Sequence, residues 1–570
     1  MKKDNYFYTY PEFDNVKELM LDSIEKNGDC RAFILKDKEG NHINVTYKDL
    51  KDEINYLGTS FFNLGLKDKR IAVVGKNSYM WALTYLATLF GNMVLVPLDK
   101  DLEDGELENC LVRSKADAVI FDEKLIEKVR NIREKGTTSL KEYITNATTD
   151  DFKNFDKVKA QGKELFESGK KDFENVKVDS DKMSILVFTS GTTSKSKAVM
   201  LSQRNVTMDI CIMKRVEGFT QEDVNLQLLP LHHMFGSTGM LIFLASGSAT
   251  AFPDGLRYIQ ANMKEYGVSI FVGVPALIEA FYKKLENGIE KQGKTKLVKA
   301  MRKITNPMGV KAKRKVFKSI IDELGGSLRV IISGAASLDN KIDKFFNEIG
   351  IRLVQGYGLT ETSPVIAAEN DRYKKAGSVG FPMNHVKVEI ADKDEQGIGE
   401  IKVQGPVVMQ GYYENEEATK DVLKGGWFYT GDYGYIDREG FLFITGRKKN
   451  MIVLQNGKKI FPEEVEELIN RIDLVKESMV FGLPKGNDLL LSVKVQYDED
   501  IANSKYSGKS EEELEKITWD RIKEVNSTFP GYKHIKNLIF TKDDFIKTTT
   551  AKIKRFEEIK KITEKIEGNS

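Results

Sequence analysis

The stretch that decides the fold runs from Thr189 to Lys197 and reads Thr-Ser-Gly-Thr-Thr-Ser-Lys-Ser-Lys. It follows the apolar run 184–188, which is typical of a buried strand, and it precedes a helical pattern. Hydroxyls, backbone N–H groups and lysines concentrated in one loop suit a polyphosphate. A loop of Ser, Thr and Gly is also compatible with a plain solvated turn, so its meaning depends on the rest of the chain. Gly191 has no second glycine before a lysine, which argues against a P-loop nucleoside triphosphatase.

Short β-branched runs alternate with helix-length amphipathic stretches on both sides of this loop. The runs are Arg70 to Val74, Val94 to Pro97, Ala118 to Phe121, Ile185 to Thr189, Ser269 to Val272, and Leu328 to Ser333. Strands that alternate with helices predict an α/β fold with mainly parallel sheets. Several of the runs lead into glycine-bearing loops, which is where open α/β sheets place their ligands.

The pattern changes after Gly446 to short strands and one clear helix start at Pro462, where three glutamates follow within the first turns. A chain of 570 residues also exceeds what one hydrophobic core usually organises. We therefore expect a large N-terminal α/β domain at residues 1–446 and a smaller α+β domain at residues 447–570.

Composition favours a folded protein of a reducing compartment. Apolar residues make up 41% of the chain and charged residues 30%, and a net charge of +2 points to no nucleic-acid partner. Cys30, Cys110 and Cys211 lie far apart and form no C-x-x-C pair, which disfavours disulfides and a zinc site. Residues 1–10 lack an apolar signal-peptide core, and no stretch approaches the roughly 20 apolar residues of a spanning helix. A cytoplasmic location is expected.

Three further motifs carry chemistry. Tyr357 to Thr362 offers an aromatic face, a tight turn and a carboxylate, which suit a nucleobase and a hard divalent cation. Tyr429 to Asp432 places a carboxylate after a glycine turn, where it can accept both hydroxyls of a ribose. Lys547 to Arg555 is a Thr-rich loop that ends in cations.

Together with the first loop, and in this order, these motifs resemble the adenylate-forming superfamily of acyl-CoA synthetases, adenylation domains and firefly luciferase. The similarity extends from about Thr46 to Arg555. It implies an enzyme that uses ATP and Mg²⁺ to convert a carboxylic acid into an acyl-adenylate and then transfers the acyl group to a thiol. It also implies that the C-terminal domain is mobile, with Lys449 at the hinge.

The resemblance assigns the ATP phosphates to the first loop. The implied positions are Thr189, Ser190, Gly191, Thr192, Thr193 and Lys197. Lys197 is the expected phosphate cation. Thr360 is implied to contact the α-phosphate, and Glu361 is implied to hold Mg²⁺.

The resemblance places adenosine on the later motifs. Tyr357 and Gly358 lie near adenine, beside a loop formed by Gly334, Ala335 and Ala336. Asp432 and Arg447 are implied to hold the ribose. Lys552 is implied to bridge the reacting carboxylate and the α-phosphate, where it neutralises developing charge. Lys552, Thr360 and Glu361 are therefore the expected catalytic residues.

The acid and the thiol have their own implied sites. Residues 229–236 resemble the element that lines the carboxylate pocket, with His233 and Phe235 in it, and Gly273 and Gly356 are expected to complete the wall. A histidine in an apolar run also fits plain packing, so we expect a wall or gate rather than acid–base catalysis. Gly457 and Lys458 are implied to face the tunnel for the pantetheine of CoA.

The phosphate loop departs from the family pattern. Ser194, Ser196 and Ala198 stand where the family commonly has Gly, Pro and Gly, Ser337 replaces a usual proline, and Ala551 replaces a usual glycine. None of these changes removes a charge or a metal ligand. We therefore expect an active enzyme, and the alternative is a nucleotide-binding scaffold without turnover.

Residues 291–318 contain eleven Lys or Arg residues and no Asp or Glu, interleaved with apolar side chains. A solvated face is one reading, and peripheral contact with an anionic membrane at its inner face is the other. The segment and the following Leu324 to Arg329 resemble long-chain fatty acyl-CoA synthetases, which favours a long-chain fatty acid with CoA as acceptor. An acyl carrier protein as acceptor, a medium-chain or aromatic acid, and a luciferase-like oxidative reaction remain the alternatives.

Overall fold

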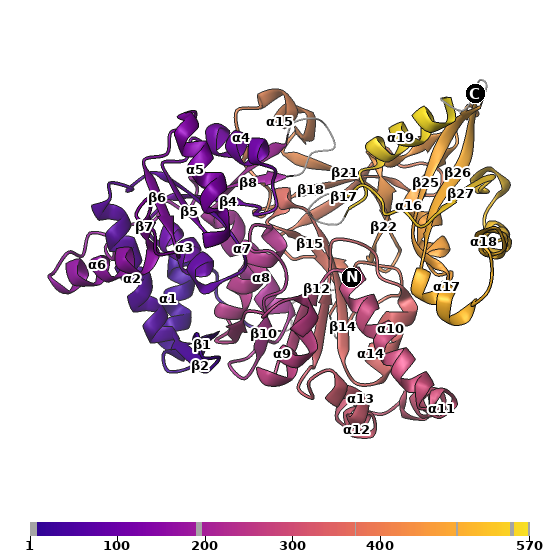
Figure 1. Cartoon of the computed structure of the whole chain (residues 1–570), viewed down its shortest axis with the longest axis horizontal. Coiled ribbons are helices and arrows are strands. Elements are labelled where there is room, and N and C mark those ends of the chain that lie inside the picture. Colours follow the sequence, from indigo (N-terminus) through magenta and orange to yellow (C-terminus); the bar gives the residue numbers. More distant parts are fainter. Residues whose placement is uncertain (1–7, 190–195, 371, 486–487, 548–551, 568–570) are drawn as a thin grey trace. The chain divides into compact units, whose positions relative to one another are not determined.

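The computed structural model describes residues 8–189, 196–370, 372–485, 488–547 and 552–567. Their contacts group into two compact units (Figure 1). Unit 1 holds the described residues of 1–189, 196–388 and 403–428, and unit 2 holds residues 389–402 and the described residues from 429 onward. The functional boundary expected between Gly446 and Arg447 stays a prediction.

The first sheet of unit 1 carries the strands that bracket the phosphate loop. Its order is β19-β9-β8-β4-β3-β5-β6-β7. The strands are β3 (Arg70–Val74), β4 (Val94–Leu98), β5 (Ala118–Phe121), β6 (Glu142–Thr145), β7 (Lys153–Asn154), β8 (Met183–Thr189), β9 (Lys197–Ser202) and β19 (Gly411–Tyr412). The pairs from β8 through β7 are parallel, whereas β8 with β9 and β9 with β19 are antiparallel. The helices that accompany this sheet are α1 (Val16–Asn27), α2 (Tyr47–Asn63), α3 (Tyr79–Phe90), α4 (Asp104–Ser114), η1 (Glu123–Leu125), α5 (Ile126–Lys135), α6 (Phe155–Glu167) and α7 (Gln203–Val216).

The second sheet of unit 1 brings several strand ends to one level. Its order is β16-β15-β14-β13-β12-β10-β11-β1-β2. The strands are β1 (Arg31–Lys36), β2 (His42–Thr46), β10 (Val224–Leu226), β11 (Ala249–Ala251), β12 (Ile270–Gly273), β13 (Val330–Ser333), β14 (Arg352–Gly358), β15 (Val365–Ala368) and β16 (Phe381–Pro382). The parallel register aligns Gly273 with Ser333 and Ser333 with Gln355. The loops that follow β12 and β13 therefore begin side by side, whereas β14 continues three residues further, to Gly358.

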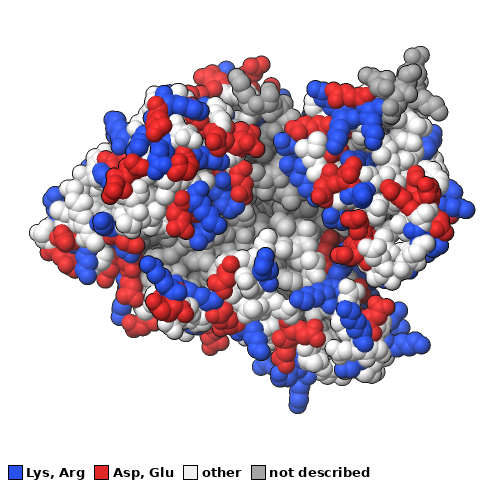
Figure 2. Space-filling view, viewed as in Figure 1, with Lys and Arg blue, Asp and Glu red and all other residues white. Residues whose placement is uncertain are grey.

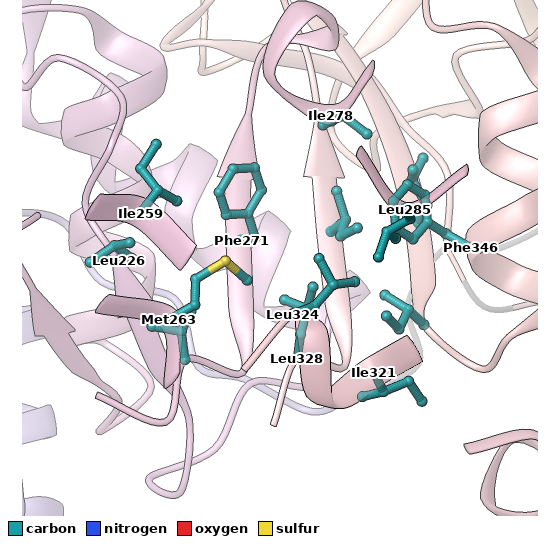
Figure 3. Packing of buried hydrophobic residues seen from close by; sticks show 14 of the residues in the cluster. Leu226, Ile259, Met263, Phe271, Ile278, Leu285, Ile321, Leu324, Leu328 and Phe346 are labelled. Atoms are coloured by element: carbon teal, nitrogen blue, oxygen red, sulfur yellow. The ribbon is translucent and has the colours of Figure 1, made fainter. Parts of the chain in front are cut away.

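Helices pack on this second sheet, and those with side chains in or against its core cluster are α9 (Ile259–Glu265), α10 (Pro275–Lys291), α11 (Thr295–Thr305), α13 (Lys318–Glu323) and α14 (Asn340–Glu348). Further helical segments of this part of the chain are α8 (Met234–Leu244), η2 (Leu256–Tyr258), α12 (Val310–Val316), η3 (Thr360–Thr362) and α15 (Glu416–Val422), of which α15 contacts β19 and β20. Figure 3 shows Phe271 of β12 packed among Met263 of α9, Ile278 of α10 and Leu324 in the turn after α13. Each such fully buried side chain contributes about 1.5–3 kcal/mol through the area it removes from water.

Unit 2 is smaller and combines two antiparallel hairpins with a helix-covered sheet. Its strands include β22 (Leu442–Arg447), β23 (Ile452–Val453), β24 (Lys459–Ile460), β25 (Val475–Lys485), β26 (Asp488–Tyr497) and β27 (Asn537–Thr541). Three strands are shared between the two units: β17 (Lys387–Ala391), β18 (Gly399–Gln404) and β21 (Trp427–Ile436). The short strand β20 (Leu423–Lys424) belongs to unit 1 and pairs with the first residues of β21. Its helices are η4 (Lys448–Asn450), α16 (Pro462–Ile469), α17 (Glu499–Lys505), α18 (Glu511–Asn526), η5 (Gly531–Lys533) and α19 (Arg555–Glu567). The helix start predicted at Pro462 is confirmed, since this proline is the first residue of α16.

A large α/β part with mostly parallel sheets and a smaller C-terminal part confirm the expected fold class. The three cysteines are free. Among the described helices, none combines the length and the apolar character needed to cross a membrane.

Candidate active site

The β8–β9 hairpin holds the two ends of the phosphate loop. Thr189 and Lys197 are opposite each other in the antiparallel register, and the Thr189 hydroxyl donates a hydrogen bond of 3.3 Å to the Lys197 carbonyl. The predicted positions Ser190, Gly191, Thr192 and Thr193 lie outside the described residues. The structure therefore places the loop's first hydroxyl and its last cation next to each other.

Tyr412 joins two of the predicted site residues. The Lys197 ammonium lies 4.6 Å from the centre of the Tyr412 ring, and the Tyr412 hydroxyl donates a hydrogen bond of 2.9 Å to Glu361 Oε1. Burial, and then the negative charge of Glu361, raise the pKa of Tyr412, so the phenol keeps its proton. Lys197, the expected phosphate cation, and Glu361, the expected metal carboxylate, thus both contact the side chain of Tyr412. The sequence motifs did not predict this role for Tyr412.

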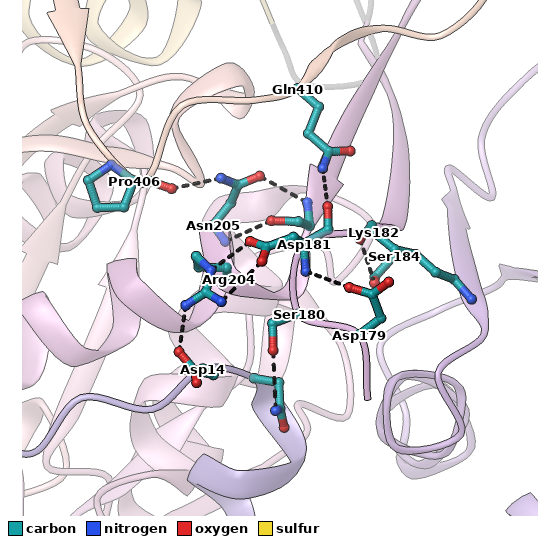
Figure 4. Close-up of polar contacts among 12 residues, drawn as sticks. Asp14, Asp179, Ser180, Asp181, Lys182, Ser184, Arg204, Asn205, Pro406 and Gln410 are labelled. Atoms are coloured by element: carbon teal, nitrogen blue, oxygen red, sulfur yellow. Dashed lines mark hydrogen bonds and ion pairs between the residues drawn. The ribbon is translucent and has the colours of Figure 1, made fainter. Parts of the chain in front are cut away.

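Strand pairing explains why Tyr412 is there. Tyr412 lies in β19, opposite Val199 of β9, and is therefore two residues along the sheet from Lys197. The chain before β19 is fixed by Asn205, whose amide donates a hydrogen bond of 2.7 Å to the Pro406 carbonyl (Figure 4). The same amide donates a hydrogen bond of 3.0 Å to the Val408 carbonyl. The Gln410 side chain in turn donates to the Asp181 carbonyl.

Arg113 of α4 holds the far end of the phosphate loop. Its guanidinium donates to the carbonyl of Ser196 at 2.9 Å and to the Ser196 hydroxyl at 3.1 Å, and it lies 5.3 Å from the centre of the Phe188 ring. Ser196 is one of the positions where the loop departs from the family pattern. A proline at this position would lack the hydroxyl that Arg113 binds. No local sequence pattern predicts this contact, because 83 residues separate the two partners.

Glu361 lies in the short helix η3, immediately after β14. Gly358 makes that turn possible, because a Cβ there would lie 1.7 Å from the Pro364 carbonyl oxygen. The Glu361 carbonyl accepts a hydrogen bond from the Met409 amide at 2.8 Å, so the backbone at Glu361 is fixed to the segment that leads to Tyr412. Thr360 begins η3 directly before it.

The residues around Glu361 fit a magnesium ion that is shared with a substrate. No group of three or more His, Cys, Asp or Glu side chains suited to a metal occurs among residues the structure describes. Mg²⁺ commonly binds proteins through one or two carboxylates and takes its other ligands from phosphates and water. Glu361 accepts from Tyr412 through one oxygen, and an ionised carboxylate has capacity for further partners. A single protein carboxylate beside a phosphate loop is therefore sufficient to hold Mg²⁺ together with the phosphates of a bound nucleotide.

The loop expected beside adenine contacts the expected acid pocket. A Cβ on Gly334 would lie 2.9 Å from the ring of Phe235, so the absence of a side chain lets the two elements meet. Ala335 has a φ of +73°, which is unusual for a residue with a Cβ and typical of strained functional loops. Ala336 follows it and is exposed. On the neighbouring strand β14, Gly356 and Tyr357 follow Gln355, which pairs with Ser333 at the start of this loop.

His233 ends the loop before α8 and is that helix's N-cap residue. Its ring centre lies 4.2 Å from that of His232, whose pKa is lowered by burial and partly restored by Asp99. Asn77 fixes this loop: its amide donates to the Leu229 carbonyl at 2.9 Å and its oxygen accepts from the Leu231 amide at 2.9 Å. Asn77 is a positioning residue that the motif did not include.

Side chains fill the space behind Phe235. A cavity lined by Leu226, Phe235, Gly239, Phe243 and Val272, among others, has a volume of about 10 Å³. That volume is about enough for one water molecule. An acyl chain would therefore fit in this space only if the lining side chains moved. Gly273, which was expected to complete the pocket wall, lies at the adjacent end of β12.

Unit 2 brings together Asp432, Arg447 and Lys552. Asp432 and Arg447 are opposite each other on β21 and β22, and Arg447 Nε lies 3.1 Å from Asp432 Oδ1. Part of the Lys552 side chain is exposed, but crowding around its ammonium lowers the pKa of Lys552, and so does Arg447, while Asp432 partly offsets this. The pair expected to hold the ribose and the expected catalytic lysine therefore form one charged group.

The loop that carries Lys552 is anchored at its base. Its remaining residues 548–551 lie outside the described part, but Lys547 and Ile553 form a β-bridge. Arg555, which begins α19, pairs with the buried Glu466 of α16. The buried Glu558 pairs with Lys494 at 2.7 Å and accepts from the Ile546 amide at 2.6 Å.

Lys449, the expected hinge, lies close to two other cations. The Lys449 side chain is exposed in part, but crowding around its ammonium, then Arg447 and Lys552, lower its pKa to about 8, with Asp432 and Glu463 opposing the shift. The adjacent Lys448 behaves oppositely, because its ion pair of 2.7 Å with Glu400 raises its pKa.

The expected CoA positions lie in the β23–β24 hairpin of unit 2. Gly457 has a φ of +76°, which favours glycine in this turn. The Lys458 ammonium lies 4.3 Å from the centre of the Tyr532 ring. Both residues are exposed. Their role toward pantetheine stays a prediction.

The fold, the four sequence motifs in their order and the comparisons with known proteins together define an adenylate-forming enzyme. The family model of the AMP-binding enzyme matches residues 21–413, and that of the AMP-binding enzyme C-terminal domain matches residues 449–569. The chain belongs to the AMP-binding enzyme family, and the resemblance inferred from its motifs is confirmed.

Curated relatives include the long-chain-fatty-acid--CoA ligase 5 of Rattus norvegicus, which is 30% identical over 496 residues that cover 81% of this chain and 72% of the relative. A chloroplastic long-chain-fatty-acid--[acyl-carrier-protein] ligase of Arabidopsis thaliana is 27% identical and covers 98% of this chain and 86% of its own length. Among solved structures, the anthranilate CoA ligase AuaEII in complex with anthranoyl-AMP has a TM-score of 0.76 at 18% identity and covers 96% of this chain and 97% of its own. At that identity the likeness supports the fold alone.

Proposed function

We propose that the chain is an acid–thiol ligase that activates a long-chain fatty acid with ATP and transfers it to CoA. The observation that carries this proposal is the contact of Lys197 and Glu361 with opposite parts of Tyr412, which assembles a phosphate cation and a metal carboxylate in one place. The long-chain assignment is supported by the names of the relatives that match most of the chain.

In the first step the carboxylate oxygen of the acid attacks the α-phosphorus of ATP. A C–O–P bond forms, the α–β phosphoanhydride bond breaks, and pyrophosphate leaves. Lys197, Thr189 and the loop between them bind the leaving phosphates, and Thr360 contacts the α-phosphate. Lys552 neutralises the charge that develops between carboxylate and phosphate.

Two other groups of residues support that step. Asp432 and Arg447 orient the ribose, while Tyr357 and the loop 334–336 position adenine. Glu361 would hold Mg²⁺, which supplies neutralisation of phosphate charge when bound. The Tyr412 hydroxyl keeps the Glu361 carboxylate oriented toward the phosphate loop.

In the second step a thiol attacks the acyl carbonyl of acyl-AMP. A C–S bond forms, the S–H bond of the thiol and the C–O bond to AMP break, AMP leaves with the electron pair, and the thiol proton passes to solvent. We propose that unit 2 supplies the pantetheine path at Gly457 and Lys458. CoA is the acceptor proposed first. An acyl carrier protein is the second candidate, favoured by the carrier-protein ligase that matches 98% of this chain.

A substrate panel tests the proposal. Pyrophosphate release is measured with acids from acetate to oleate and with benzoate, and the acyl product is measured with CoA and with a holo acyl carrier protein. The expected result is the highest kcat/KM for oleate and a CoA thioester as product. A preference for a medium-chain or aromatic acid, or for the carrier protein, would reassign the substrate. Absence of pyrophosphate release with every acid would leave only a nucleotide-binding scaffold.

A further inference from the structure

Helices α11 and α12 and the turn between them expose five large apolar side chains to solvent, which we call the ridge. The side chains that form it are Leu297 (57% exposed), Ile304 (66%), Met308 (42%), Val310 (61%) and Val316 (39%). Leu297 and Ile304 are seven residues apart in α11 and therefore lie on one face of the helix. Large aliphatic side chains gathered on one exposed surface commonly mark a site that binds another apolar surface.

The same helices are fixed to unit 1 from their other side. Val298 and Met301 pack against the core cluster of the second sheet. Arg302 pairs with Glu348 at 2.6 Å and lies 4.9 Å from the centre of the Phe345 ring. The ridge is thus the outer face of a helix that already has a packed inner face.

Arg314 has a similar internal role in α12. Its guanidinium donates hydrogen bonds to the carbonyls of Leu328 at 2.6 Å and Gly326 at 3.3 Å. Two of the eleven cations counted in the sequence therefore hold the helices in place. They do not belong to the outer surface.

Lysines flank the ridge. Those that are exposed and have no ion pair with a described carboxylate are Lys291, Lys294, Lys296, Lys299, Lys303, Lys311 and Lys315. Lys318 pairs with Asp322 at 2.6 Å. Figure 2 shows Lys and Arg side chains projecting from the lower edge of the view, where Figure 1 places α11 and α12.

We propose that this ridge docks the enzyme on the surface of an anionic lipid bilayer. The aliphatic side chains enter the boundary between headgroups and acyl chains, and the lysines extend to the phosphates while their stems cover apolar surface. The charge is complementary, because residues 291–318 contain no acidic side chain. The proposal concerns where the enzyme works and holds whichever acid it activates.

The composition of the ridge favours a bilayer over a protein partner. Protein interfaces concentrate their binding energy in Trp, Tyr and Arg, and they are depleted in Lys. Residues 291–318 contain no Trp or Tyr, and their two arginines face unit 1. Aliphatic residues flanked by lysines are what an interfacial helix requires.

Vesicle flotation with the full-length chain tests this inference. Vesicles of phosphatidylcholine with 30% phosphatidylglycerol, about a third anionic lipid, are compared with pure phosphatidylcholine, because surface attraction to cations needs anionic headgroups. We expect binding to the anionic vesicles only, weakened strongly between 0.15 and 1 M salt as the Debye length falls from about 8 to about 3 Å. Equal binding to both vesicles, or no binding to either, would overturn the proposal.

Two variants separate the charge from the ridge. Replacing Lys296, Lys299 and Lys303 by Gln should reduce the vesicle partition coefficient about 100-fold, since each cation near an anionic surface contributes about fivefold. Leu297→Ser with Ile304→Ser should also reduce it at least tenfold without changing net charge. The matched control replaces Lys157, Lys163 and Lys170, which are exposed on and after α6, by Gln and should bind like the unmodified chain.

Circular dichroism and thermal unfolding verify that all variants fold, because every substituted side chain is exposed. If the control loses as much binding as the ridge-flanking lysines, the attraction is general and the ridge has no specific role. If sedimentation shows a dimer that Leu297→Ser with Ile304→Ser abolishes, the ridge binds a second copy of the chain and the lipid proposal is wrong.

Discussion

Tyr412 is the residue on which the phosphate site depends most directly. Tyr412→Phe keeps the ring beside Lys197 and removes the hydrogen bond to Glu361. Hydrogen bonds to charged groups contribute about 1.5–3 kcal/mol, so we expect the KM for Mg-ATP to rise about 10- to 100-fold. Pyrophosphate–ATP exchange across a Mg²⁺ titration measures the effect, with Glu361→Gln expected to lose more. The adjacent Tyr413→Phe is the control, and an equal change there would contradict a specific role for Tyr412.

Lys449 should titrate near neutral pH. Its pKa is lowered to about 8, so it is charged below that pH and neutral above it, whereas an ordinary lysine stays charged to about 10.4. Because the folded pKa lies below the unfolded one, the charged lysine destabilises the fold below pH 8, and this cost disappears as the pH rises toward 10.4. Labelling by an amine-specific reagent, followed by peptide mass spectrometry, should reach half its maximum rate near pH 8.

Lys448 provides the internal control for that titration. Its ion pair with Glu400 raises its pKa, so its labelling should rise at a higher pH than that of Lys449. Identical pH profiles for the two neighbours would show that the cations Arg447 and Lys552 do not act on Lys449.

At the scale of elements, the pair between Glu466 of α16 and Arg555 of α19 positions the loop that carries Lys552. Removing one partner of a buried ion pair commonly costs about 3–5 kcal/mol, because the other charge is left unpaired. Glu466→Gln should therefore speed hydrogen exchange in α16 and α19 and lower the rate of adenylation. Exchange mass spectrometry of the full chain measures the first effect, and pyrophosphate release measures the second.

Replacing both partners tests the reason for that loss. Glu466→Met with Arg555→Met leaves no unpaired charge, so part of the protection of α16 and α19 from hydrogen exchange should return. The surface pair of Arg521 and Glu524, which lies on α18 and is largely exposed, is the matched control, since such pairs contribute at most about 1 kcal/mol. If Arg521→Gln alters adenylation as much as Glu466→Gln does, the anchoring role is wrong.

At the scale of the whole molecule, the prediction is that the C-terminal domain reorients between the two steps. Lys552 near the α-phosphate and a pantetheine path cannot occupy the same place. Lys552→Ala should lose adenylation by about 10²–10³ yet still transfer supplied acyl-AMP to CoA. Lys449→Pro, which fixes φ at the expected hinge, should make acyl-AMP and transfer it poorly.

The two half-reactions are measured separately in both variants. Pyrophosphate release reports the first, and acyl-CoA formation from supplied acyl-AMP reports the second. Equal loss of both steps in each variant would contradict reorientation and would make Lys449 one more exposed cation of residues 447–449.

The sequence alone determined the α/β class, the start of α16 and the presence of the nucleotide motifs. These features depend on residues a few positions apart: alternation of strands and helices, a proline at the first helical position, and glycines such as Gly358 that permit a tight turn. The sequence predicted a helical pattern directly after the phosphate loop, whereas the structure has strand β9 there, paired antiparallel with β8, and α7 begins only at Gln203. Assignment to the family required nothing beyond such local motifs in their order.

Only the tertiary structure decided which side chains support those motifs. Tyr412 reaches Glu361 across 51 residues, Arg113 reaches Ser196 across 83, and Arg555 reaches Glu466 across 89. The structure also divided the basic segment 291–318 into inward arginines and outward lysines. The physical reason is that local motifs follow from backbone propensity and loop chemistry, whereas these contacts follow from strand order, register and helix packing, which bring together residues that no sequence spacing relates.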